Sequence, residues 1–261
     1  MQSPKANKEL GQHFLHDQQV LGRIAAACKV AAGDNVLEIG PGPGALTSHL
    51  LALGVKLAVL EKDERFPPLL QAMADEHGKG IAIHLQDALQ TDFKTLAPHG
   101  STVVGNLPYN VGTEIVMRLM KPTNTFTPPH FARMVFMLQK EVVLRLVAKV
   151  GDDDWGRLAV WADVLTDRRR LFDVGPGAFN PPPKVTSSVV ELVPLPQPRY
   201  DVDFKKLERL LNAAFMQRRK MLRRSLKGMV TDAQMETCGI APTQRPEELN
   251  TAQLCALANL L

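Results

Sequence analysis

The stretch Asn35–Leu50, NVLEIGPGPGALTSHL, decides the fold class that the sequence predicts. An apolar run typical of a buried strand leads into a turn with glycines at positions 40, 42 and 44, and a helical pattern follows. Glycine tolerates a positive φ angle and leaves room for a ligand against the backbone. A strand, a glycine-rich turn and a helix in this order predict the first unit of a nucleotide-binding α/β sheet.

The rest of the first two-thirds of the chain alternates strand-like and helical patterns, which predicts βαβ units and a parallel sheet. The expected strands are Asn35–Ile39, Val55–Leu60, Ile81–Leu85, Thr102–Gly105 and Phe131–Leu138. The expected helices between them are Ala45–Leu53, Glu64–Glu76 and Thr113–Met120. After a helix near Arg157–Leu165, two more strands are expected at Arg170–Val174 and Ser187–Val193. The loop GPGAFNPPPK between them is expected to have no regular structure.

Only helical patterns follow the proline-rich segment PLPQPRY at residues 194–200. They cover Asp203–Met216, Arg218–Met229, Asp232–Cys238 and Thr251–Leu260. The sequence therefore predicts a Rossmann-like α/β domain over residues 1–195 and a small all-helical domain over residues 196–261.

Composition excludes several classes of protein. Hydrophobic residues make up 45% of the chain and charged residues 22%, as in ordinary globular proteins. No apolar run reaches the roughly 18 residues of a membrane span, and the first residues lack the apolar core of a secretion signal. Three widely spaced cysteines fit neither a disulfide framework nor a metal site. We expect a cytoplasmic protein without a metal, and nothing indicates an obligate oligomer.

The net charge of +4 is unevenly distributed. Residues 199–230 contain ten Lys and Arg against three Asp and Glu, and six of the ten lie within RRKMLRRSLK at residues 218–227. Such clustering is typical of a surface for a polyanionic partner, although a solvated helix face is an equally ordinary explanation.

Three carboxylates follow or lie on the first strands and could hold a nucleoside. Glu61 ends the second strand, where a carboxylate can accept both ribose hydroxyls. Asp87 follows the third strand and could accept from an adenine amino group. Glu38 could meet the amino group of a methionine moiety. The sequence shows no second nucleotide signature, so a single adenosine-containing ligand, S-adenosylmethionine (SAM), fits better than a dinucleotide.

The segment Asn106-Leu-Pro-Tyr109 comes after the fourth strand, at the same edge of the sheet as the glycine turn. An exocyclic aromatic amine is a poor nucleophile because its lone pair is delocalised. The Asn106 side-chain oxygen and the Leu107 carbonyl could accept its N–H groups, Pro108 would fix the angle of that carbonyl, and Tyr109 would stack on the base. A turn whose Tyr fills core space is the structural alternative.

A second aromatic residue, Phe179, opens the proline-rich FNPPPKVTSS segment. It could form the other wall around the base, and Lys184 adds a cation nearby. A Phe that anchors the loop to the core is the alternative explanation.

These motifs, taken together, resemble the ribosomal RNA adenine N6,N6-dimethyltransferases, and among them the bacterial members that act on small-subunit 16S ribosomal RNA. The resemblance rests on GQHFLHD, EIGPGPGALT, VLEKD, QDAL, GNLPYNV, FNPPPKVTSSVV and the tail FMQRRKMLRRSL. It implies SAM as donor, two adjacent target adenosines near the RNA 3′ end and a role in assembly of the 30S subunit.

The residues that the motifs and the resemblance assign fall into three sets. The expected cofactor contacts are His13, Leu15, Glu38, Gly40, Gly42, Glu61, Lys62, Asp87, Ala88 and Asn106. The expected adenine contacts are Asn106, Leu107, Pro108, Tyr109 and Phe179. The expected RNA contacts are Lys184, Arg218, Arg219, Lys220, Arg223 and Arg224.

Two positions depart from the family pattern. Members commonly have Asn where this chain has His13, and Pro43 replaces a more usual Leu or other residue in the glycine turn. Three other functions remain open at this point. They are modification of large-subunit RNA, a non-catalytic RNA-binding or assembly role on the same fold and, more distantly, a nicotinamide-dependent dehydrogenase.

Overall fold

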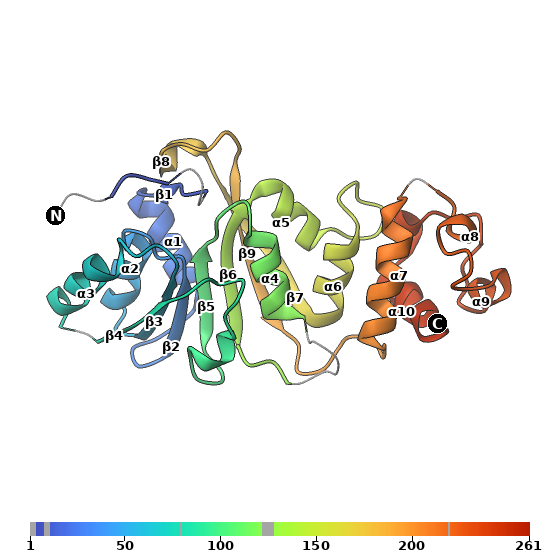
Figure 1. Ribbon diagram of the computed structural model, residues 1–261, viewed down its shortest axis with the longest axis horizontal. Helices are drawn as coiled ribbons and strands as arrows, with labels where there is room; N and C mark the ends of the chain where they lie inside the picture. Colours follow the sequence, from blue (N-terminus) through green and yellow to red (C-terminus); the bar gives the residue numbers. More distant parts are fainter. Residues whose placement is uncertain (1–3, 8–10, 79, 122–127, 219) are drawn as a thin grey trace. The chain divides into compact units, whose positions relative to one another are not determined.

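The computed structural model of the protein describes residues 4–7, 11–78, 80–121, 128–218 and 220–261. The chain divides into two compact units (Figure 1). Unit 1 comprises Met1–Leu119, Pro129–Val143 and Arg169–Pro194, and unit 2 comprises Met120–Pro128, Leu144–Arg168 and Leu195–Leu261. The predicted boundary near residue 195 falls where the last segment of unit 1 ends, and two earlier segments also belong to unit 2.

Unit 1 is built on a seven-stranded sheet with the strand order β4-β3-β2-β5-β6-β9-β7 (Figure 1). Its strands are β2 Asn35–Ile39, β3 Lys56–Glu61, β4 Ile81–Leu85, β5 Thr102–Asn106, β6 Arg133–Gln139, β7 Thr166–Val174 and β9 Ser187–Pro194. The first five of these run parallel, which confirms the predicted parallel sheet, and β9 pairs with β6 in the antiparallel direction.

Helices α1 Gln18–Ala27, α2 Ala45–Ala52, α3 Pro67–Glu76 and α4 Gly112–Met120 belong to the same unit. The sequence analysis missed α1, which begins after Asp17 because the Asp17 carboxylate accepts the amides of Gln19 and Val20. Helix α3 begins three residues later than expected, at Pro67, whose fixed φ suits the first helical position.

One hydrophobic cluster joins α1, α2 and α3 to the sheet. Leu21 and Ile24 of α1, Leu50 of α2 and Leu70 of α3 pack in it, together with apolar residues of β2, β3, β5, β6 and β9. The packing covers one face of the sheet, so the carboxyl ends of the parallel strands stand at a common, rigid edge.

The proline-rich loop is more regular than expected. It contains a short 3-10 helix, η2 Pro176–Ala178, and a two-residue strand, β8 Phe179–Asn180. Strand β8 pairs antiparallel with β1 Phe14–Leu15, so Leu15 lies opposite Phe179. The expectation of no regular structure was wrong because this pairing joins segments that are far apart in the sequence.

Unit 2 is helical apart from the start of β7. Its helices are α6 Arg157–Leu165, α7 Phe204–Met216, α8 Leu222–Ser225, α9 Asp232–Thr237 and α10 Thr251–Asn259, with a 3-10 helix η3 Pro246–Glu248. Helices α6, α7 and α10 pack against one another. Helix α5 Lys140–Val147 begins in unit 1 and ends in unit 2.

The prediction of one helix over Arg218–Met229 was wrong, because among the described residues of this range only Leu222–Ser225 form a helix, α8. The amides of Leu222 and Arg223 donate to the carbonyls of Gln244 and Pro242 instead of to a preceding helical turn. Gly228, with φ at +80°, follows the short helix. Arg219 lies outside the described residues. Within the described part of the chain, no helix is long and apolar enough to cross a membrane.

Candidate functional site

A cavity of about 160 Å³ opens at the carboxyl edge of the parallel strands in unit 1. Its lining includes every expected cofactor contact except Ala88, and these are His13, Leu15, Glu38, Gly40, Gly42, Glu61, Lys62, Asp87 and Asn106. Leu107, Pro108 and Tyr109 line it as well. The sheet therefore brings together two groups of residues that are far apart in sequence.

The glycine turn between β2 and α2 depends on left-handed backbone geometry. Gly40, Gly42 and Gly44 have φ angles of 69°, 54° and 90°. A side chain at Gly44 would meet Met73 at 2.8 Å, and one at Gly42 would touch the Phe14 ring at 3.4 Å. Glycine is favoured here mainly for conformation, because other residues rarely adopt these positive φ angles.

Glu61 at the end of β3 is almost buried and fixed by three backbone amides. The amide of Gly42 donates to Oε2 at 3.0 Å, and the amides of Lys62 and Asp63 donate to Oε1 at 2.8 Å each. Burial raises the pKa of Glu61, while these N–H groups oppose that shift. The carboxylate is thus held against the glycine turn, where a carboxylate can accept ribose hydroxyls.

Glu38 on β2 lies in a different environment. Its side chain is only 2% exposed, and Oε2 accepts the Thr47 hydroxyl at 2.7 Å. Burial raises the pKa of Glu38 to about 8, with a further contribution from Glu61 and an opposing one from Thr47. A buried acid that lines a cavity and lacks a cation is suited to a positively charged ligand group.

Asp87 follows β4 and is paired with Lys62. Lys62 Nζ lies 2.8 Å from Asp87 Oδ2, and Leu89 donates its amide to Oδ1. The Lys62 ammonium holds the pKa of Asp87 below its usual range. Ala88, beside it, is half-buried and outside the cavity lining.

The Asn106–Tyr109 segment leaves the sheet where β5 ends. A side chain at Gly105 would meet the Ile39 carbonyl oxygen at 2.5 Å, so glycine lets β5 lie close to β2. The Leu107 amide donates to Met137, and the Pro108 carbonyl accepts from Gly112 at 2.8 Å. These bonds hold the segment on both sides of the Leu107 carbonyl.

The Asn106 side chain is oriented by the N-terminal segment. Its Nδ2 donates to the His13 carbonyl at 3.0 Å. This bond fixes the orientation of the amide group, so that Oδ1 can accept a hydrogen bond from a ligand.

His13 also contacts the aromatic part of the site. Its ring stacks on Tyr109 with centroids 5.4 Å apart and planes at 27°. Its Nδ1 lies 2.8 Å from the Pro181 carbonyl, which can only accept, so Nδ1 carries a proton. The Tyr109 hydroxyl meets Ser187 Oγ at 2.5 Å. The histidine at this position therefore positions Tyr109 through ring contact.

Phe179 and Lys184 are placed away from the cavity lining. The Phe179 ring is 3% exposed and belongs to the hydrophobic core cluster, because β8 pairs Phe179 with Leu15. This placement corresponds to the alternative explanation of a loop anchor. Lys184 is exposed.

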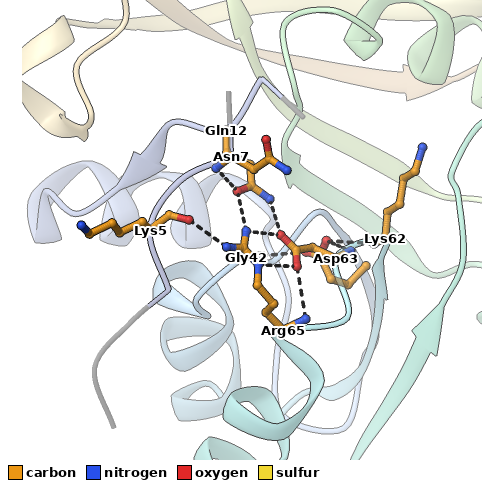
Figure 2. Close-up of polar contacts among 8 residues, drawn as sticks. Lys5, Asn7, Gln12, Gly42, Lys62, Asp63 and Arg65 are labelled. Atoms are coloured by element: carbon orange, nitrogen blue, oxygen red, sulfur yellow. Dashed lines mark hydrogen bonds and ion pairs between the residues drawn. The ribbon is translucent and has the colours of Figure 1, made fainter. Parts of the chain in front are cut away.

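Sequence patterns did not indicate a polar network that ties Lys5, Asn7 and Gln12 to Asp63 and Arg65 (Figure 2). Arg65 donates through Nε and Nη2 to Asp63 at 2.8 and 2.5 Å, and through Nη1 to the Lys5 carbonyl at 3.1 Å. Gln12 Nε2 donates to Asp63 at 2.9 Å, and Gln12 Oε1 accepts the Asn7 amide. No local pattern indicated the role of Asp63 and Arg65, because their partners are about 50 residues away.

The basic segment of unit 2 is partly paired. Arg218 donates to Glu247 at 2.8 Å and to the Asp153 carbonyl. Lys220, Arg223 and Arg224 are exposed. Among the described residues, no group of His, Cys, Asp or Glu could hold a metal ion.

Comparisons with known proteins agree on one family. The family model "Ribosomal RNA adenine dimethylase" matches residues 3–261. The chain is 45% identical to "Ribosomal RNA small subunit methyltransferase A" of Pseudomonas fluorescens (strain Pf0-1), over 98% of this chain and 93% of that protein. It is 44% identical to the protein of that name from Agrobacterium fabrum, with the same coverages.

Solved structures give the same fold. A dimethyladenosine transferase from Plasmodium falciparum superposes with a TM-score of 0.78 and 25% identity, over 94% of this chain and 96% of that one. The 23S rRNA methyltransferase ErmE superposes with a TM-score of 0.70 and 24% identity, over 94% and 98% of the two chains.

Proposed function

The chain belongs to the ribosomal RNA adenine dimethylase family, and we propose that it methylates N6 of two adjacent adenosines near the 3′ end of 16S ribosomal RNA. The protein is an RNA methyltransferase, and SAM is the proposed donor. The proposed substrate is the small (30S) ribosomal subunit during its assembly in the cytoplasm, with the enzyme acting as a monomer. The observation that carries this proposal is that three carboxylates suited to a nucleoside and the Asn106–Tyr109 segment line the same cavity.

The residues that line the cavity have the chemistry that SAM requires. The glycine turn leaves space for the ligand, Glu61 would accept the ribose hydroxyls, and Asp87 would accept the adenine amino group. Glu38 would pair with the methionine ammonium and would lose its proton as it did so. When bound, SAM supplies an electrophilic methyl group on a sulfonium centre.

The target adenine would be held at the opposite side of the cavity. Asn106 Oδ1 and the Leu107 carbonyl would accept the two N6–H groups, which turns the nitrogen lone pair toward the methyl group. SAM would supply the methyl group with its sulfur as the leaving group, and Asn106 and Leu107 would hold N6 ready to accept it. N6 then loses a proton to water or to Asn106, and a second cycle adds the second methyl group.

Tyr109 would stack on the extruded base. Its other ring face already contacts His13, so base, Tyr109 and His13 would form one stack. A base could meet Phe179 only after that ring leaves the core, so we assign stacking to Tyr109. Lys184 and the basic residues of unit 2 would contact RNA phosphates.

The substrate assignment is tested with methyl-labelled SAM and ribosomal subunits that lack the modification. We expect label at N6 of the two adjacent adenosines in small-subunit RNA and no label in large-subunit RNA. Label confined to large-subunit RNA would overturn the assignment.

Asn106→Ala tests the site. Losing the acceptor that orients N6 is expected to lower kcat by at least about a hundredfold, while RNA affinity stays within about threefold. Full activity of this variant in the same label assay would exclude the proposed role.

A further inference from the structure

Six cationic side chains gather around the edge strand β7 in unit 1. We call them the β7 basic strip, and they are Arg23, Lys29, Arg133, Lys140, Arg169 and Arg170. Among the described residues, their ion-pair partners are two carboxylates, those of Glu191 and Asp173. The strip therefore carries an excess of four positive charges, outside the basic segment found in the sequence.

One end of the strip is organised by a nearly buried acid. The Glu191 side chain is 7% exposed and pairs with Lys29 at 3.2 Å, with Arg169 at 2.9 Å and with Arg133. One carboxylate neutralises one charge but positions three cations. The side chains of Lys29 and Arg169 remain 53% and 64% exposed, so their charge is open to solvent.

The other end of the strip is connected to the Asn106–Tyr109 segment. Asp173 pairs with Arg170 at 2.6 Å and with Lys140 at 2.8 Å, and the Lys140 amide donates to the Thr186 carbonyl at 3.0 Å. The neighbouring residue, Ser187, bonds the Tyr109 hydroxyl at 2.5 Å. A short chain of contacts thus links the cations of this end to the ring proposed to stack on the target base.

We propose that the β7 basic strip binds backbone phosphates of the RNA strand that carries the target adenosine, with Lys140 and Arg170 nearest that nucleotide. This inference rests on the proposed function, because it takes the polyanion to be ribosomal RNA. Oriented Arg and Lys side chains with uncompensated charge suit phosphates, which fix the register of a nucleic acid without reading its sequence. The competing explanation is that the cations only prevent β7 from pairing with another chain.

The test is the double variant Arg169→Gln/Arg170→Gln, with binding to unmodified small subunits measured over a range of salt concentrations. Loss of two phosphate contacts is expected to reduce the slope of log K against log salt by roughly 1.4 to 1.8 and to weaken binding about tenfold near physiological salt. SAM affinity and melting temperature are measured alongside, because neither residue lines the cavity.

Two matched variants separate position from charge. Lys56→Gln/Lys94→Gln removes the same charge from exposed residues at the start of β3 and in the 3-10 helix η1 Phe93–Thr95, and it should keep the wild-type slope. Arg169→Lys/Arg170→Lys keeps the charge and should also keep the slope. If the double Gln variant does not fold, Arg170→Gln alone should give about half the change.

An unchanged slope in the double Gln variant would overturn the proposal and leave the strip as protection for an edge strand. An equal change in the Lys56/Lys94 control would overturn it as an effect of net charge. Failure of the proposed function is visible separately, because the wild-type enzyme would then leave small-subunit RNA unlabelled.

Discussion

At the scale of single residues, the three carboxylates of the cavity differ through their surroundings. Glu61 accepts three backbone amides, Asp87 is paired with Lys62, and Glu38 accepts the Thr47 hydroxyl as its one bond among the described residues. These differences give each acid a different state before any ligand binds. Burial raises the pKa of Glu38 to about 8, so Glu38 keeps its proton through neutral pH.

Glu38 should make the stability of the free protein depend on pH. Its pKa is about 8 in the folded protein, against an ordinary glutamate pKa of 4.5. Between these values the folded state holds a proton that the unfolded chain has released, so stability falls as pH rises through this window and levels off above about 8. Glu38→Gln removes this dependence. From pH 6 to 8 we expect the wild type to lose a few degrees of melting temperature relative to the variant.

The control for that experiment is Glu64→Gln, which changes the same chemical group at an exposed position. Its melting profile should follow the wild type across the pH range. Parallel profiles of wild type and Glu38→Gln would contradict the predicted state of Glu38.

At the scale of elements, described residues near the N-terminus contact both the proposed SAM site and the Asn106–Tyr109 segment. Lys5 and Gln12 are tied to Arg65 and Asp63 (Figure 2), and the His13 carbonyl orients Asn106. Arg65 holds the pKa of Asp63 down to about 2, so this pair stays ionised at any physiological pH. This ion pair therefore keeps its contacts to Lys5 and Gln12 across that pH range.

Arg65→Ala should release these residues near the N-terminus. We expect SAM affinity to fall about five- to twentyfold by isothermal titration, because Gly11–Leu15 would no longer be held against the cavity. Lys5→Ala is the matched control, since Lys5 accepts from Arg65 through its backbone carbonyl and the substitution keeps that group. Equal affinities of Arg65→Ala and wild type would show that the network does not position these residues.

Local sequence patterns predicted the elements that depend on local interactions. The β2 strand, the glycine turn and α2 follow from a buried apolar run and three glycines with positive φ. The pairing of β1 with β8 could not be predicted, because neither two-residue strand has a pattern of its own. The helix over Arg218–Met229 failed for a similar reason: carbonyls of Pro242 and Gln244 take amides that a longer helix would use.

The candidate site was predictable to the same extent. Acids at the ends of successive parallel strands meet because the sheet aligns those ends, so Glu61 and Asp87 line one cavity. The packing of Phe179 depends on its pairing with Leu15, and the contact of His13 with Tyr109 depends on the path of the N-terminal segment. Those contacts become visible only in the folded structure.

At the scale of the whole molecule, positive charge occurs in both units. The β7 basic strip lies in unit 1, while Arg223 and Arg224 of α8 are exposed in unit 2. A substrate as large as a ribosomal subunit could contact both units in one complex. Charge in two separate units would then contribute to one binding free energy, whereas a small RNA could use either surface alone.

If the β7 basic strip and α8 contact the subunit in one complex, their effects on the salt dependence of binding should add. Arg223→Gln/Arg224→Gln should reduce the slope of log K against log salt for small subunits by roughly 1.4 to 1.8 and leave SAM affinity unchanged. Combining it with Arg169→Gln/Arg170→Gln should reduce the slope by roughly twice as much, because each neutralised phosphate contact contributes its own released counterions. A combined variant with no larger effect than either pair would show that the two surfaces do not contact the subunit in one complex. Arg223→Lys/Arg224→Lys, which keeps the charge, should match the wild type.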